Sequence, residues 1–181
     1  GSFVLKSYSH GDTAALINAA IKLDIVSIIN KHVPPGKDGT KPTRDGLSVG
    51  GSLLFAALGR ACHPTSKLGW YDWCQDTSLE YCLQGQFKKL DSQHFWDQMN
   101  ALPSESIALI EDEIVKKLVH SYGVELDCLF FDTTNFFTFI ASDNKRCDLP
   151  QRGKNKQHRY DLRQIGMALL VSRREHFPLF H

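Results

Sequence analysis

The chain has 181 residues, 42% hydrophobic and 23% charged, a balance typical of a globular protein that can bury a core. Its five cysteines form an odd set without a CxxC pair, which argues against a secreted disulfide framework and a structural zinc site. No run of about 18 apolar residues and no signal-peptide pattern is present, so we expect a cytoplasmic protein without a membrane segment.

The first 122 residues are expected to form a helical domain. Asp12 is a candidate N-cap for a first helix and Asp24 for a second. Ser48 is expected to begin an apolar helix that contains Gly50 and Gly51, each costing roughly 1 kcal/mol relative to Ala. We therefore expect these glycines where another helix packs closely.

Large aromatic residues are frequent between positions 70 and 96. Aromatic side chains near basic residues can stack on nucleic-acid bases. These residues recur at helical spacing beside leucines, so we interpret them as core residues. Asp91 is a candidate cap for the helix that contains the last two. The set comprises Trp70, Tyr71, Trp73, Tyr81, Phe95 and Trp96.

The clearest helical pattern runs from Ser104 to Ser121, and Gly123 is expected to end that helix. An apolar stripe at steps of three and four predicts its buried face: Ile107, Ile110, Ile114 and Leu118. Two acid–base pairs at a spacing of four are expected on its surface: Asp112 with Lys116, and Glu113 with Lys117.

From Val124 onward the pattern indicates β-strands, so the predicted fold class is α+β. Residues 126–134 are apolar on both faces around Asp132, which predicts a central strand covered on both sides, with Cys128 as a small core residue. Residues 135–140 can continue this strand. Residues 165–171 predict a second strand and residues 177–181 a third, joined as an antiparallel meander.

Asp132 has two interpretations. At the end of a strand it can cap the following turn through its side chain. A carboxylate on a fixed strand can also aim an oxygen at a metal ion or a substrate. The segment 143–163 favours the second interpretation, because it carries seven Lys or Arg residues against three Asp and is therefore +4 in a chain of net charge +1. A local basic segment of this kind suits DNA phosphates.

These residues resemble a known family. The run 130–137, FFDTTNFF, is similar to the strand that carries the first catalytic Asp in DDE transposases of bacterial and archaeal insertion sequences. Residues 151–165 resemble the RGxSKDHRPDLxQ block of one branch, with Asn155, Gln157 and Tyr160 where Ser, Asp and Pro are usual. The helical region is similar to the N-terminal domain of that branch through LSVG at 47–50, PTSK at 64–67 and DW at 72–73.

The resemblance implies a helical domain of residues 3–122 that binds transposon ends or dimerises. An RNase H-like catalytic domain would begin at residue 123. Family members cut and join DNA with two Asp and one Glu that hold two Mg²⁺ or Mn²⁺ ions. Only Asp132 is carried over, as a catalytic residue and metal ligand. The chain corresponds to the N-terminal half of such an enzyme, so we expect it to be inactive alone.

The basic block supplies the expected contacts with the DNA backbone of a prokaryotic nucleoid. The candidates are Arg152, Lys154, Lys156, His158, Arg159 and Arg163. A solvated mobile loop is the alternative interpretation of this block. For the whole chain, the alternatives are a non-catalytic DNA-binding or regulatory protein derived from a truncated transposase, and a helical oligomerisation module. An exposed sheet edge would also favour a homodimer.

Overall fold

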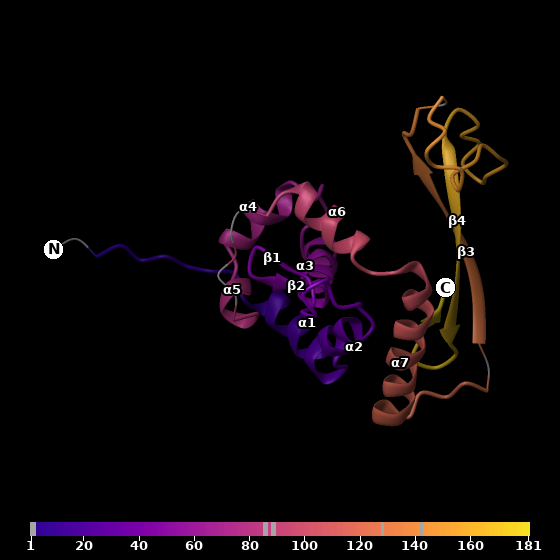
Figure 1. Cartoon of the computed structure of the whole chain (residues 1–181). Coiled ribbons are helices and arrows are strands. Elements are labelled where there is room, and N and C mark those ends of the chain that lie inside the picture. The colour runs from indigo at the N-terminus through magenta and orange to yellow at the C-terminus, as the bar shows by residue number, and fades with distance from the viewer. Residues whose placement is uncertain (1–2, 85–86, 88–89, 128, 142) are drawn as a thin grey trace. The chain divides into compact units, whose positions relative to one another are not determined.

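The computed structural model describes residues 3–84, 87, 90–127, 129–141 and 143–181, and it has an α+β fold, as predicted (Figure 1). The chain divides into two compact units, Gly1–Leu118 and Val119–His181, which we call the helical unit and the sheet unit. None of the described helices is long and apolar enough to cross a membrane.

The described residues of the helical unit form six complete helices, most of a seventh and one short hairpin. They are α1 (Gly11–Lys22), α2 (Ile25–Lys31), β1 (Thr43–Arg44), β2 (Leu47–Ser48), α3 (Val49–Cys62), α4 (Gly69–Gln75), α5 (Leu79–Cys82), α6 (Ser92–Asn100) and α7 (Ser104–Tyr122). The sheet unit contains β3 (Leu129–Thr138), β4 (Arg163–Ser172) and β5 (Pro178–Phe180).

The predicted start of a helix at Ser48 and the predicted helix cap at Asp91 are confirmed. The Ser48 Oγ accepts from the backbone N–H of Gly51 at 3.1 Å and so caps α3. The Asp91 carboxylate accepts from the backbone N–H of His94 at 2.8 Å and caps α6. Each cap gives a partner to an N–H group that the helix itself leaves unpaired.

The other two caps differ from the prediction. Helix α1 begins at Gly11, so Asp12 lies inside its first turn, where the carboxylate accepts from the backbone N–H of Thr13. Asp24 does precede α2, but its backbone is left-handed (φ 54°) and its side chain makes no capping bond. The Asp24 carboxylate instead pairs with Lys117 of α7 at 2.5 Å.

The expected close approach of a helix is confirmed at Gly50. A Cβ atom there would lie 2.6 Å from the carbonyl oxygen of Val26 in α2, so any larger side chain would push the two helices apart. The space around Gly51 is different, because its nearest neighbours are Ser48 and Leu47 at the start of its own helix.

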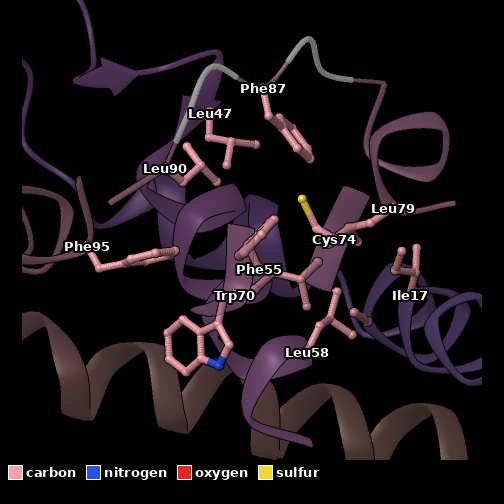
Figure 2. Close-up of a cluster of buried hydrophobic side chains, with 12 residues drawn as sticks. Ile17, Leu47, Phe55, Leu58, Trp70, Cys74, Leu79, Phe87, Leu90 and Phe95 are labelled. Atoms are coloured by element: carbon pink, nitrogen blue, oxygen red, sulfur yellow. The ribbon is translucent and has the colours of Figure 1, made fainter. Parts of the chain in front are cut away.

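The core of the helical unit is built around Phe55, which is completely buried in α3 (Figure 2). The Phe87 and Phe95 ring centroids each lie 5.8 Å from that of Phe55, and Trp70 meets Phe95 edge to face at 5.2 Å. The core interpretation is therefore confirmed for Trp70 and Phe95. Two other predicted core aromatics, Tyr81 and Trp96, are 72% and 50% exposed.

Helix α7 ends as predicted, because Gly123 adopts φ 63° and donates its backbone N–H to the Val119 carbonyl. Of the predicted stripe, Ile110 and Leu118 are buried, whereas Ile107 is 43% exposed.

One of the two predicted surface pairs of α7 is present. Lys116 pairs with Asp112 at 2.5 Å. The predicted pair of Glu113 with Lys117 is wrong, because both side chains take partners from the α2 region. Glu113 accepts from Lys31 at 2.8 Å and lies 2.7 Å from His32, and Lys117 takes Asp24. The hydrogen bond from Lys31, followed by that from His32, lowers the pKa of Glu113.

The sheet unit is an antiparallel meander in the order β3-β4-β5, as predicted. β3 continues to Thr138, so Asp132 is the fourth of its ten residues and not its end. Among the described residues, β3 pairs with β4 alone and is largely exposed, so the prediction of a central strand covered on both faces is wrong there. The predicted role of Cys128 lies outside the described residues.

Candidate nucleic-acid interface

Asp132 sits on an open face of the β3–β4 ladder. Its registered partner on β4 is Leu169, and the alternation of a strand places Asp132 on the same face as Phe130 and Thr134. The carboxylate is exposed, and the described part of the chain offers it no hydrogen bond or ion pair. The capping interpretation of Asp132 is therefore wrong, because β3 runs on past it.

A single carboxylate fits one position in the coordination shell of a magnesium ion. Mg²⁺ commonly takes one or two carboxylates and completes its octahedron with water and substrate phosphate oxygens. The described residues contain no group of three or more His, Cys, Asp or Glu side chains that could hold a metal. The described residues around Asp132 therefore do not form a complete metal site by themselves.

The candidate DNA contacts lie in the connection between β3 and β4. We call residues 151–164 the basic loop. Its two ends are joined by a pair of backbone hydrogen bonds between Gln151 and Gln164, of 3.1 and 2.9 Å. The Gln164 side chain also donates to the Lys154 carbonyl at 3.2 Å. The loop is therefore closed on itself where β4 begins.

Asn155 makes three side-chain hydrogen bonds inside the basic loop. Its amide nitrogen lies 3.1 Å from the Gly153 carbonyl and 3.0 Å from the Arg159 carbonyl. Its amide oxygen accepts from the Arg159 backbone N–H at 2.9 Å. One neutral side chain thus joins both sides of the turn, which includes His158 in a left-handed conformation (φ 55°).

The six candidate cations are not equivalent. Lys154 and Lys156 are exposed and have no acidic partner in the part of the chain that is described. Arg159 is exposed but forms a two-point bond with Asp161, both distances being 2.8 Å. Arg163 is half-buried and donates to the carbonyls of residues 144 and 147. The two lysines are therefore the cations most available to phosphates.

The Arg159–Asp161 ion pair also keeps the Asp161 carboxyl group negatively charged. The hydrogen bond from Arg159 is the largest cause that lowers the pKa of Asp161 to about 2, and the nearby Arg152 adds to it. Asp161 stays ionised at all ordinary pH values.

Next to this pair, the Tyr160 hydroxyl lies 3.1 Å from His158 Nδ1, and the tyrosine ring is 55% exposed. An exposed ring among cations is suited to stacking on a base.

A serine–histidine–aspartate chain occurs in the helical unit, where the sequence gives no signal for it. Ser52 Oγ lies 3.0 Å from His94 Nε2, and His94 Nδ1 lies 2.9 Å from Asp45. This order resembles a hydrolytic triad. Ser52 and His94 are completely buried, so a substrate carbonyl cannot reach the hydroxyl.

The same chain of hydrogen bonds has a structural role. It joins the β1–β2 turn, α3 and α6, which contribute Asp45, Ser52 and His94. The hydrogen bond with His94 is the largest cause that lowers the pKa of Asp45.

Comparison with models of known protein families, with curated proteins and with solved structures finds no match to this chain. The resemblance to DDE transposases therefore rests on the residues of the 130–137 run, the basic loop and the helical segments alone.

Proposed function

We propose that this chain is the N-terminal half of a DDE transposase, whose complete form cuts DNA at transposon ends and joins the strands to a target. The observation that carries the proposal is a single hairpin with two matched features. β3 presents the exposed carboxylate of Asp132, and the connection from β3 to β4 is the closed basic loop. In this proposal the sheet is the start of an RNase H-like domain.

In this proposal the two features of the hairpin contact different parts of the DNA. Thr138 lies six residues beyond Asp132, or roughly 20 Å along a strand that rises about 3.3 Å per residue. Successive phosphates of one DNA strand are about 3.4 Å apart along the helix axis. The basic loop would thus hold the duplex on the order of six phosphates from the bond that is cut.

Each part of the chain then has a defined task. Asp132 would hold one magnesium ion through a carboxylate oxygen. Two such ions, when bound, activate the attacking oxygen and stabilise the leaving oxygen. Lys154 and Lys156 would neutralise backbone phosphates and release counterions, which gives affinity without sequence preference.

A non-catalytic DNA-binding protein is the second candidate function. It is favoured by one observation, that the described residues contain no group of three or more His, Cys, Asp or Glu side chains that could hold a metal. The two functions share the basic loop and differ only in whether Asp132 takes part in chemistry.

Replacement of Asp132 separates these functions. In the longest protein that the gene encodes, Asp132→Asn is expected to abolish Mg²⁺-dependent strand cleavage of transposon-end DNA and to leave DNA binding unchanged. Asp127→Asn, an exposed carboxylate just before the same strand, is the matched control and should retain cleavage. Cleavage by the Asp132→Asn protein at the wild-type rate would contradict the catalytic assignment.

A further inference from the structure

The helical unit has a cavity of about 420 Å³ at the turn between α3 and α4. Five residues line it: Arg60, Thr65, Ser66, Lys67 and Trp70. Every one of these side chains carries a hydrogen-bond donor, and no carboxylate is among them. Three of them belong to the segment 64–67, which the proposed function leaves without a task.

The two cations of this cavity keep their charge available. Arg60 is exposed at the end of α3, and no carboxylate pairs with it or with Lys67 among the residues described. The Lys67 ammonium lies 4.5 Å from the centroid of the Trp96 ring. This cation–π contact positions the ammonium without neutralising it.

Trp70 adds a donor in a fixed position. The side chain is only 6% exposed, and its Nε1 is buried without a hydrogen-bond partner among the described residues. A Cβ atom on Gly59 would come within 2.8 Å of the indole, so this glycine lets the ring lie against α3. Figure 2 shows the indole below Phe55 with Phe95 beside it, a packing that holds the ring in place.

We propose that this cavity binds a phosphate group. Its guanidinium, ammonium and two hydroxyl groups offer donors to several oxygens of a tetrahedral anion, and charge-assisted bonds to phosphate are among the stronger hydrogen bonds. The phosphate belongs either to a nucleic-acid backbone or to a free phosphate compound. If it is a backbone phosphate, the helical unit makes its own contact with DNA, separate from the basic loop.

The test follows the indole N–H resonance of Trp70 by NMR while inorganic phosphate is added at constant ionic strength. Trp70→Phe identifies the resonance among the three tryptophans. A saturable shift is expected with phosphate and not with chloride. Arg60→Gln combined with Lys67→Gln should weaken binding at least about tenfold, since two charge-assisted contacts are lost. A shift that rises linearly without saturation would overturn the proposal.

A matched variant excludes a general effect of net charge. Lys22→Gln combined with Lys37→Gln removes two exposed charges of the same unit away from the cavity and should leave phosphate binding unchanged. Equal binding by both double variants would also overturn the proposal. Thermal unfolding verifies that each variant is folded. If the cavity variant is not, Arg60→Gln alone decides the test, because Arg60 is an exposed side chain, and Lys67→Arg should retain binding.

A short DNA duplex and a nucleoside monophosphate then identify the source of the phosphate. Displacement of inorganic phosphate by the duplex, with the same shift of the Trp70 resonance, assigns the site to a nucleic-acid backbone. Displacement by the monophosphate alone assigns it to free phosphate compounds. Failure of the basic loop to bind DNA would leave the phosphate titration unaffected, so the two proposals fail independently.

Discussion

The two units of this protein are stabilised in different ways. The helical unit buries a continuous aromatic cluster around Phe55, whereas the sheet unit buries few of its described residues, with Val124, Ser172 and Leu179 among them. Large apolar side chains of the sheet unit are exposed to solvent. Phe131 is 66% exposed and Phe139 is 87% exposed. Backbone pairing therefore contributes most to the sheet unit, and side-chain burial to the helical unit.

Because of this difference, we expect substitutions to affect stability differently in the two units. Substitutions in the helical core remove packed volume, and the surrounding atoms relax only in part. Substitutions on the open faces of β3 remove side chains that water already contacts. We expect stability to depend on the first unit and recognition of DNA to depend strongly on the second.

The largest effect is expected from Phe55→Ala. This change should lower the free energy of unfolding of the helical unit by about 3–5 kcal/mol, because it leaves a cavity at the centre of the aromatic cluster. Phe131→Ala is the matched control in β3 and should cost no more than about 0.5 kcal/mol. Denaturant unfolding followed by tryptophan fluorescence measures the first change and circular dichroism the second. Similar losses in both variants would contradict the comparison.

A smaller effect is expected from Asp45→Asn. It weakens the hydrogen bond to the buried His94 and should cost about 1–3 kcal/mol. The pKa of Asp45 is lowered in the folded protein, so its carboxylate stabilises the fold above its ordinary pKa of 3.8. This contribution is lost as the pH falls through the lower, folded pKa.

Unfolding curves measured from pH 6 to pH 2 test this linkage. The difference in stability between wild type and Asp45→Asn should be constant at the upper end and shrink below about pH 4. Asp76→Asn is the control, since the Asp76 carboxylate is exposed and has no hydrogen bond or ion pair among the described residues. A difference that grows as the pH falls would show that the assigned sign is wrong.

The smallest effect is expected from Asn155→Ala in the basic loop. All the cations remain, but the three hydrogen bonds that close the turn are lost, so DNA affinity should fall about three- to tenfold. The slope of affinity against salt should change little, because the charge is unchanged.

Gln157→Ala is the control for Asn155→Ala. It removes a neutral amide from the same turn, and this amide has no partner among the described residues, so affinity should stay at the wild-type value. Fluorescence anisotropy with a labelled duplex measures both variants. Equal affinities would show that Asn155 does not position the loop.

Local patterns predicted the fold well where the partners are close in sequence. Ser48 and Asp91 cap their helices because each partner lies three residues away. The predicted pair of Glu113 with Lys117 was wrong because Lys31 and His32, which are distant in sequence, pair with Glu113 instead. The edge position of β3 depends on which strands lie beside it. The hydrophobic periodicity of residues 126–134 cannot predict those neighbours.

The candidate sites show the same limit. Asp132 and the basic loop are continuous runs, so the sequence marks them. The Asp45–Ser52–His94 chain combines residues from three separate elements. Only the tertiary fold brings these side chains together, so the periodicity of the sequence does not predict their contacts.

The salt dependence of DNA binding tests the central claim most directly. The affinity of the chain for a short duplex is measured across a range of salt concentrations, for wild type and for a variant with Arg152, Lys154 and Lys156 replaced by Gln. A matched variant with Lys22, Lys37 and Arg173 replaced by Gln is the control for net charge. We predict that the basic-loop variant binds more weakly and that its slope is smaller by roughly two to three phosphate contacts, whereas the control keeps the wild-type slope. Identical slopes for all three proteins would contradict the assignment of the basic loop to DNA.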